Sequence, residues 1–354
     1  GDLVIYKPNP NFRDAAKGLF ERIELKGGGD AVSAARSVFQ TGEYDYAWNL
    51  QVEAPVLDDV MKGGKGELVT APGSGVEQVY FPFADTTKET NGERGAPGTQ
   101  HPFLKDIKVR QAMSMAIDKQ TMSKQLYGPT GDPTNNVLTT PGNLSSKTST
   151  HEFNIEKANK ILDEAGWKKG SDGIREKDGK KLKFVFQTSI NQPRQKTQAI
   201  VKQACQKAGI DIEVKAVTAS VFFSSDVANP DTYPHFYADL QMYNNGPLQP
   251  DPEVFMRQFC SWEAASKANK WQGRNITRWQ NQEYDDIHKA AQVELDPIKR
   301  AAMFIKLNEL VINNNVVIPV VARLGVAAVK DKLVVELSGW DNNTFNLASW
   351  YREA

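Results

Sequence analysis

Histidines, paired carboxylates and nucleophilic side chains are the residues that could catalyse a reaction or bind a metal, and here they form no recognisable constellation. None of the four histidines lies within five residues of another: His101, His151, His235 and His288. The chain has neither the His-Glu-x-x-His motif of zinc enzymes nor the Gly-x-Ser-x-Gly turn of serine hydrolases. We therefore predict a protein that is not an enzyme and that uses no cofactor or metal.

A turn-rich segment from Met242 to Glu253 has the composition of a binding loop. It offers two neutral hydrogen-bonding side chains, Asn244 and Asn245, and one carboxylate, Asp251. It follows an alternating strand and precedes a helix, and ligands bind beyond the carboxyl ends of strands in α/β folds. Asparagines that only form a turn are an open alternative, as is an Asp251 that only caps the following helix.

Aromatic residues would supply the apolar wall of such a site. Three tryptophans lie close together in the sequence, at Trp262, Trp271 and Trp279. We expect one of them to contact the ligand, and choose Trp271 together with Arg274, because tryptophan and arginine carry much of the energy of recognition. Earlier in the chain, Phe81 and Phe83 share one face of an extended segment, and at least one of them is expected to face a cleft.

These candidate residues are held by alternating strands and amphipathic helices. Residues 181–188 and 210–217 read as strands, and a helix is expected between them at 194–208. Strand, helix and strand joined by short turns predict a βαβ unit with parallel strands. A third strand is expected at 236–243, and Pro297 after Asp296 marks the start of a helix.

Length and charge restrict the class of protein. The 354 residues exceed what one hydrophobic core usually spans, so we expect two lobes. Lysine plus arginine and aspartate plus glutamate both total 43, and this zero net charge argues against a nucleic-acid partner. The mean hydropathy is −0.50, and no apolar run approaches the roughly 20 residues of a membrane helix.

The two cysteines, Cys205 and Cys260, leave two alternatives open. They are either buried thiols or, in an oxidising compartment, a disulfide that would add on the order of 4 kcal/mol of stability.

Four blocks of sequence carry a resemblance to a known family. Residues 102–119 read Pro-Phe-Leu-Lys-Asp-Ile-Lys-Val-Arg-Gln-Ala-Met-Ser-Met-Ala-Ile-Asp-Lys and place an apolar stripe on one helix face. This block resembles the signature helix of the extracellular solute-binding proteins of ABC importers, in the class that carries dipeptides, oligopeptides, nickel chelates and some sugars. The blocks at 153–167, 281–287 and 296–320 are similar to the family's later blocks and occur in its order.

The resemblance implies the fold and the division into domains. It implies an α/β, two-lobed periplasmic binding protein-like fold with mixed sheets and with hinge strands between the lobes. We expect lobe one to comprise residues 1–84, with 325–354 returning to it, and lobe two to comprise residues 85–324. Family members usually carry a long region before the part that residues 4–85 resemble, so the chain is expected to be a C-terminal portion of a longer protein.

The resemblance also implies a function. The expected role is that of the substrate-binding component of a peptide-type importer. The protein would be exported and would work in the periplasm or another extracytoplasmic compartment. It would act as a monomer, capture a small solute (a peptide or a related compound) between the lobes, and deliver it to a membrane permease. In the peptide binders an acidic residue three positions before the Asp-Pro step pairs with the peptide's amino terminus, but here that position is Leu248. A ligand-sensing or chaperone-like module on the same fold is the alternative.

Overall fold

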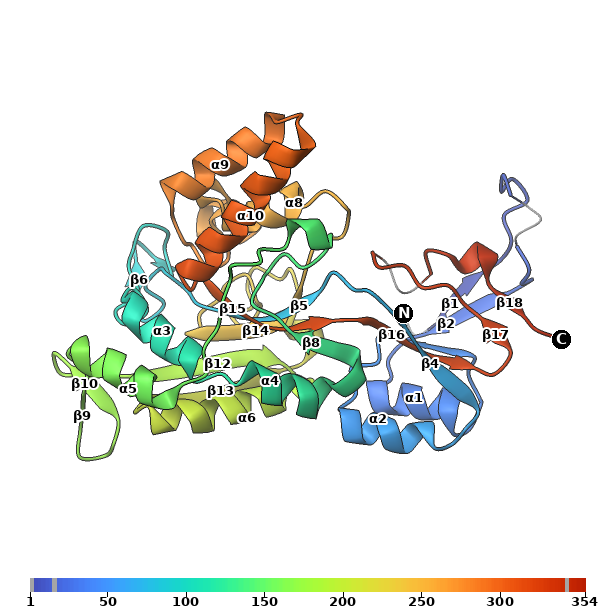
Figure 1. The fold of residues 1–354 in the computed structure, drawn as a ribbon, viewed down its shortest axis with the longest axis horizontal. Helices are drawn as coiled ribbons and strands as arrows, with labels where there is room; N and C mark the ends of the chain where they lie inside the picture. The colour runs from blue at the N-terminus through green and yellow to red at the C-terminus, as the bar shows by residue number, and fades with distance from the viewer. Residues whose placement is uncertain (1–2, 15–17, 341–343) are drawn as a thin grey trace. The chain divides into compact units, whose positions relative to one another are not determined.

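The chain forms two compact units, which we describe separately (Figure 1). The structure is a computed structural model that describes residues 3–14, 18–340 and 344–354. Unit 1 consists of Gly1–Gly73, Lys124–Asp132 and Arg323–Ala354, and unit 2 of Ser74–Ser123 and Pro133–Ala322. The chain therefore crosses between the units four times, and residues 124–132 make an excursion into unit 1 that the sequence did not indicate.

A mixed sheet of six strands forms the centre of unit 2, in the order β13-β12-β14-β5-β15-β8, and its last strand, β8, spans the chain crossing between Asp132 and Pro133. These strands are β5 (Val76–Tyr80), β8 (Gly131–Pro133), β12 (Lys183–Ser189), β13 (Asp211–Val217), β14 (Leu240–Asn245) and β15 (Val317–Arg323). The pairs of β12 with β13 and with β14 are parallel, which confirms the predicted βαβ unit. β5 pairs antiparallel with both of its neighbours, which makes the sheet mixed as predicted.

The place of β5 explains where the boundary between the units falls. Residues 74–84, which the sequence-based division placed in lobe one, belong to compact unit 2, and the extent of the two lobes stays a prediction. Both hydrogen-bonding edges of β5 are occupied by strands of unit 2, and all five of its residues are buried. A strand bonded on both sides moves with the sheet that contains it.

Helices of unit 2, apart from the short α7 and α8, begin where a polar side chain accepts hydrogen bonds from their first turn. They are α3 (Ile107–Met115), α4 (Lys119–Met122), α5 (Ile155–Glu164), α6 (Gln192–Lys207), α7 (Ala219–Phe222), α8 (Glu253–Met256), α9 (Gln282–Val293) and α10 (Pro297–Asn313). The capping residues of the longer ones are Asp106, Asn154, Asn191, Asn281 and Asp296. The predicted start at Pro297 is confirmed, because Asp296 accepts from the backbone of Ile298 and Lys299.

Unit 1 packs two helices against a small sheet. The helices are α1 (Ala31–Phe39) and α2 (Ala54–Met61), and the sheet order is β3-β16-β4. The strands of the unit are β1 (Leu3–Tyr6), β2 (Ile23–Lys26), β3 (Tyr46–Trp48), β4 (Gly66–Ala71), β16 (Gly325–Lys330), β17 (Leu333–Val334) and β18 (Tyr351–Arg352). Phe39, Leu57 and Val326 belong to its buried core.

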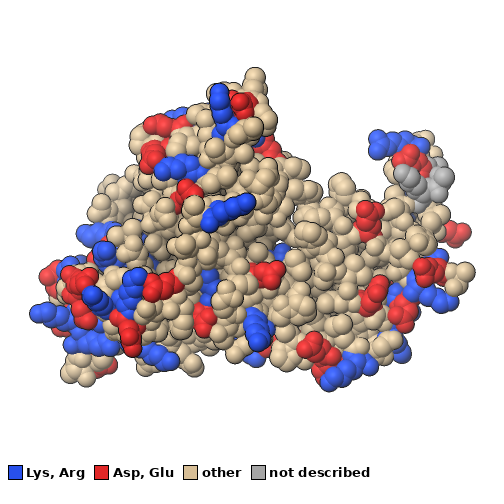
Figure 2. All heavy atoms as spheres, in the orientation of Figure 1, with Lys and Arg blue, Asp and Glu red and all other residues tan. Residues whose placement is uncertain are grey.

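Short β-ribbons complete unit 2, and charges of both signs cover it. The ribbon strands are β6 (Glu89–Thr90), β7 (Glu93–Arg94), β9 (Lys168–Lys169), β10 (Arg175–Lys177) and β11 (Lys180–Lys181). On the face that Figure 2 shows, basic and acidic residues intermix and gather where β9 and β10 lie in Figure 1. This face carries no field of a single sign of the kind that binds nucleic acid.

The signature helix α3 is held by a buried arginine. The guanidinium of Arg110 donates to the carbonyl oxygens of Leu104 and of Asn314, the latter at 3.0 Å. It also lies 4.5 Å from the ring centroid of Phe83. Arg110 thus ties the start of α3 to the residue that follows α10, because a buried guanidinium must find hydrogen-bond partners.

A second buried arginine forms an ion pair beside the central strand. Arg194, in the first turn of α6, donates from Nε and Nη2 to the two carboxylate oxygens of Glu77 on β5, at 2.9 and 3.1 Å. Its Nη1 donates to Ser189 Oγ at 2.9 Å. Both members of the pair are buried, so the pair locks α6 onto β5.

The two cysteines are buried, free thiols. Cys205 lies on α6, whereas Cys260 belongs to the hydrophobic cluster that α10 helps to form. The disulfide that the sequence left open is therefore not formed in this structure. Burial raises the pKa of Cys205 to about 12 and also raises that of Cys260, so both thiols stay protonated near neutral pH.

Protonated, buried thiols should be unreactive. In native protein we expect neither Cys205 nor Cys260 to react with a thiol reagent within minutes, and both to react in denaturant. The intact mass should be the same before and after reduction. A mass lower by two hydrogens before reduction would contradict the free-thiol state.

Breaking the buried ion pair should be costly, because one charge would be left in the interior. We expect Glu77→Gln to lower the free energy of unfolding by about 3 kcal/mol in urea titrations. The double variant Glu77→Gln/Arg194→Met should recover part of that loss. As a matched control, Glu152→Gln breaks the half-exposed pair with Lys157 and should cost under about 1 kcal/mol. Equal effects at the two sites would contradict this account.

Lys119 should make stability depend on pH. Its ammonium is buried, donates to Thr134 O at 3.1 Å and to Asn135 Oδ1 at 3.3 Å, and burial lowers its pKa to about 7. Because the unfolded chain holds this proton up to about pH 10.4, wild-type stability should rise relative to Lys119→Met between pH 7 and pH 10. Over this range the free energy of unfolding of wild type, relative to that of Lys119→Met, should rise by about 1.4 kcal/mol per pH unit.

Urea titrations at several pH values would measure this difference. Lys147 is exposed, so Lys147→Met is the control, and its free energy of unfolding should vary with pH as that of wild type does. A difference between wild type and Lys119→Met that does not change with pH would show that the amine keeps its ordinary pKa.

Candidate functional site

The carboxyl ends of three parallel strands meet at one edge of the unit 2 sheet, which we call the carboxyl edge. β12, β13 and β14 end there at Ser189, Val217 and Asn245. The antiparallel strand β5 begins at the same edge, where Val76 lies opposite Asn245. Because all the loops after the parallel strands start from this edge, it is the place where the fold can assemble a ligand site.

Asn245 organises the edge from within. Its Nδ2 donates to Gln258 Oε1 at 2.9 Å and to the hydroxyl of Tyr80 at 3.3 Å, and its Oδ1 accepts from the backbone of Gly246. The ring of Tyr80 stacks on that of Tyr243, with centroids 4.6 Å apart. Asn245 is thus engaged by the protein itself and ends strand β14 rather than forming a turn, and its contact with a ligand stays a prediction.

Asn244 differs from its neighbour. Its side chain packs closely on Gly75, where an added Cβ would lie 2.3 Å from Asn244 Oδ1. Its Nδ2 is buried and has no hydrogen-bond partner among the described residues. An amide donor without a partner at a strand end is the kind of group that a ligand oxygen or a bound water satisfies.

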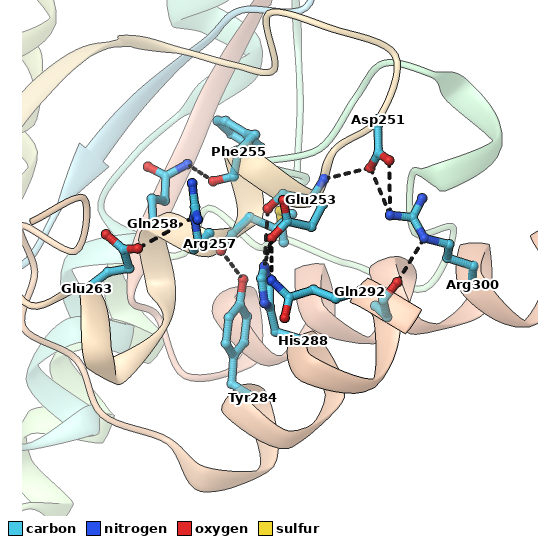
Figure 3. A network of polar contacts seen from close by, with 12 residues as sticks. Asp251, Glu253, Phe255, Arg257, Gln258, Glu263, Tyr284, His288, Gln292 and Arg300 are labelled. Atoms are coloured by element: carbon cyan, nitrogen blue, oxygen red, sulfur yellow. Dashed lines mark hydrogen bonds and ion pairs between the residues drawn. The ribbon is translucent and has the colours of Figure 1, made fainter. Parts of the chain in front are cut away.

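Asp251 holds the loop in place, as Figure 3 shows. Its Oδ1 accepts from the backbone of Glu253 at 3.0 Å, and Arg300 on α10 donates to both carboxylate oxygens at 3.0 Å. Beneath it, His288 Nε2 lies 3.1 Å from the carbonyl oxygen of Glu253. Asp251 thus bonds the first residue of α8 and Arg300, although the N-cap of that helix is Pro252, and its contact with a ligand stays a prediction.

Trp271 and Arg274 lie in the segment between α8 and α9. The indole of Trp271 packs 4.1 Å from the imidazole of His235, and its Nε1 is buried with no partner among the described residues. Arg274 is exposed, and no described residue pairs with its guanidinium. The contact of Trp271 with His235 places this loop against the segment that carries Tyr233, whose pKa is raised by burial.

The two phenylalanines after β5 differ in what they expose. Phe81 is completely buried in unit 2, and its backbone donates to Val316 O. Phe83 is half-buried, with its ring 6.5 Å from that of Trp279 and beneath Arg110. Phe83 therefore has free surface and Phe81 has none, while contact of either ring with a ligand is untested.

Some groups at the carboxyl edge carried no signal in the sequence. Glu77 and Arg194 lie 117 positions apart, and no periodic pattern connects them. Phe223 and Tyr233 follow β13, and their rings lie 6.0 Å apart. The position of both residues after a predicted strand is the one feature that could have singled them out.

Unit 1 contains a separate cavity of about 420 Å³. Its lining includes Tyr44, Tyr46 and Trp350, and the ring of Trp350 lies 4.8 Å from that of Tyr46. No sequence pattern pointed to it. It lies in the other unit and is not part of the carboxyl edge.

Two further properties bear on function. Within the described ranges, no group of three or more histidine, cysteine, aspartate or glutamate side chains is placed to hold a metal ion. Among the helices of the same residues, none is long and apolar enough to cross a membrane.

Known proteins of similar sequence include an oligopeptide-binding protein and an ABC transporter-binding protein. The oligopeptide-binding protein AppA of Bacillus subtilis is 32% identical over 127 residues, which are 33% of this chain and 23% of that protein. A probable ABC transporter-binding protein of Deinococcus radiodurans is 28% identical over 232 residues, 61% of this chain and 38% of that protein. The chain thus spans less than two fifths of the length of these relatives.

Solved structures share the fold. That of AppA from Bacillus subtilis in complex with a nonapeptide superposes with a TM-score of 0.78 at 19% identity, over 100% of this chain and 64% of that one. That of NikZ from Campylobacter jejuni in complex with Ni(L-His) gives 0.80 at 20% identity, over 99% and 66%. The predicted two-lobed periplasmic binding protein fold is confirmed.

The match to a family model covers more of this chain than either of the sequence relatives reported above. Residues 1–267 match the middle region of the bacterial extracellular solute-binding proteins, family 5, which is more than half of the chain. The blocks at 102–119 and 153–167, on which the resemblance rested, lie inside the matched range. This chain belongs to the family 5 bacterial extracellular solute-binding proteins.

Proposed function

We propose that this protein is the extracytoplasmic substrate-binding component of a peptide-type ABC importer. It captures a small solute, a peptide or a related compound, between its two lobes and delivers it to a membrane permease. It acts as a monomer and performs no chemistry on the solute. The observation that carries this proposal is the family match over residues 1–267 on a chain that folds as two α/β units.

The four chain crossings support a mechanism by domain closure. Each crossing segment is a place where the backbone can absorb a change in direction while the units keep their internal structure. A solute that binds both lobes stabilises the closed state only by its greater affinity for that state. The permease would then recognise the closed form. We further propose that the lobes correspond to the two units, with the first boundary before β5.

Closure should be measurable. Native mass spectrometry of the whole gene product, purified from its host, should reveal a bound small molecule. Adding that compound to stripped protein should lower the radius of gyration in small-angle X-ray scattering, because the lobes close around it. An unchanged radius of gyration at saturating solute would contradict the hinge mechanism, and turnover of the solute would contradict a pure binding function.

A further inference from the structure

Exposed apolar side chains follow each of the three parallel strands of unit 2. Ile190 after β12 is 56% exposed, Phe223 after β13 is 46% exposed, and Leu248 after β14 is 85% exposed. Val227, in the same loop as Phe223, is 45% exposed. Single exposed hydrophobic residues are ordinary, but here at least one follows each strand at the edge where the fold assembles ligand sites.

The ring of Phe223 belongs to an aromatic cluster that extends into the buried interior of unit 2. The ring of Phe223 lies 6.0 Å from that of Tyr233 and 6.2 Å from that of Tyr243. Tyr233 and Tyr243 lie 5.3 Å apart, and Tyr243 stacks on the buried Tyr80. The half-exposed Phe223 and the partly exposed Tyr233 therefore rest on a rigid aromatic base, which a binding surface for an apolar group requires.

The carboxylates near this edge are largely neutralised. Three of them form ion pairs: Glu77 with Arg194, Asp231 with Lys215 and Asp251 with Arg300. Asp226 is the exception, since it is exposed and accepts a hydrogen bond from the backbone of Ala228. An ammonium group arriving at the edge would thus find one carboxylate without a basic partner among the described residues.

A positive charge, by contrast, is available beside the aromatic cluster. The guanidinium of Arg274 is exposed and has no ion pair within the described parts of the chain. The loop that carries it packs against the segment of Tyr233, because the ring of Trp271 lies 4.1 Å from that of His235, whose Nδ1 is 2.6 Å from Thr232 Oγ1. A guanidinium recognises a carboxylate through two parallel hydrogen bonds.

We propose that the carboxyl edge of unit 2 binds a solute with an apolar body and a carboxylate. Phe223 and Tyr233 contact the apolar body, and Arg274 binds the carboxylate. A free ammonium group is not required, so the solute class is that of N-acylated amino acids and peptides. This inference rests on the proposed function and assigns the substrate class of the same binding protein.

A matched pair of probes tests the inference by isothermal titration calorimetry. N-acetyl-Leu-Phe carries a carboxylate and no ammonium, whereas Leu-Phe amide carries an ammonium and no carboxylate. We expect the acetylated acid to bind at least about tenfold more tightly, as a charge-assisted pair warrants. Arg274→Gln should remove that advantage and leave the affinity for the amide unchanged. Phe223→Ala should weaken binding of both probes, because both carry the apolar body.

Lys270→Gln is the control variant, because it removes a positive charge from an exposed residue of the same loop. It should change neither affinity, and the melting curves of all variants should match wild type. Tighter binding of the amide, lost in Asp226→Asn, would overturn the inference while the binding function stands. Failure of both probes, with a host-derived solute still closing the lobes, would also overturn it. If no solute closes the lobes, the proposed function itself fails.

Discussion

The hydrogen bonding of β5 on both of its edges is the constraint on which unit 2 depends. The strand enters the unit directly after the first chain crossing and pairs with β14 on one side and β15 on the other. Those two pairings fix the register of Asn245 against Val76, and so determine where the carboxyl edge lies. The buried pair of Glu77 with Arg194 then sets the start of α6 against the same strand.

The loops around the carboxyl edge are held by groups far apart in the sequence. Asn245 bonds to Gln258, and Asp251 bonds to Arg300 on a helix that begins 46 residues after it. Arg278 is buried in the same way, and its guanidinium donates to carbonyl oxygens such as that of His235 at 2.8 Å. Burial lowers the pKa of Arg278 to about 10, yet the side chain stays charged at neutral pH and pins two loops together.

Local patterns predicted the elements, whereas long-range contacts decided the roles of the site residues. The βαβ unit and the start of α10 could be predicted because alternation, helical periodicity and an Asp-Pro cap are local signals. The sequence could not show that Asp251 pairs with Arg300 or that Phe81 is enclosed, because both depend on segments that meet only in the fold. Nor could it show that β5 pairs with β14 and β15, which lie more than 150 residues further along the chain.

The four crossings have a consequence for the covalent integrity of the molecule. A protein whose domains follow one another along the chain falls into two pieces when its linker is cut. Here a protease that nicks one connecting segment leaves three other peptide links between the halves. The same redundancy means that neither half can be expressed as one continuous stretch of polypeptide, so evolution can exchange the two halves only by rearranging the gene at several points.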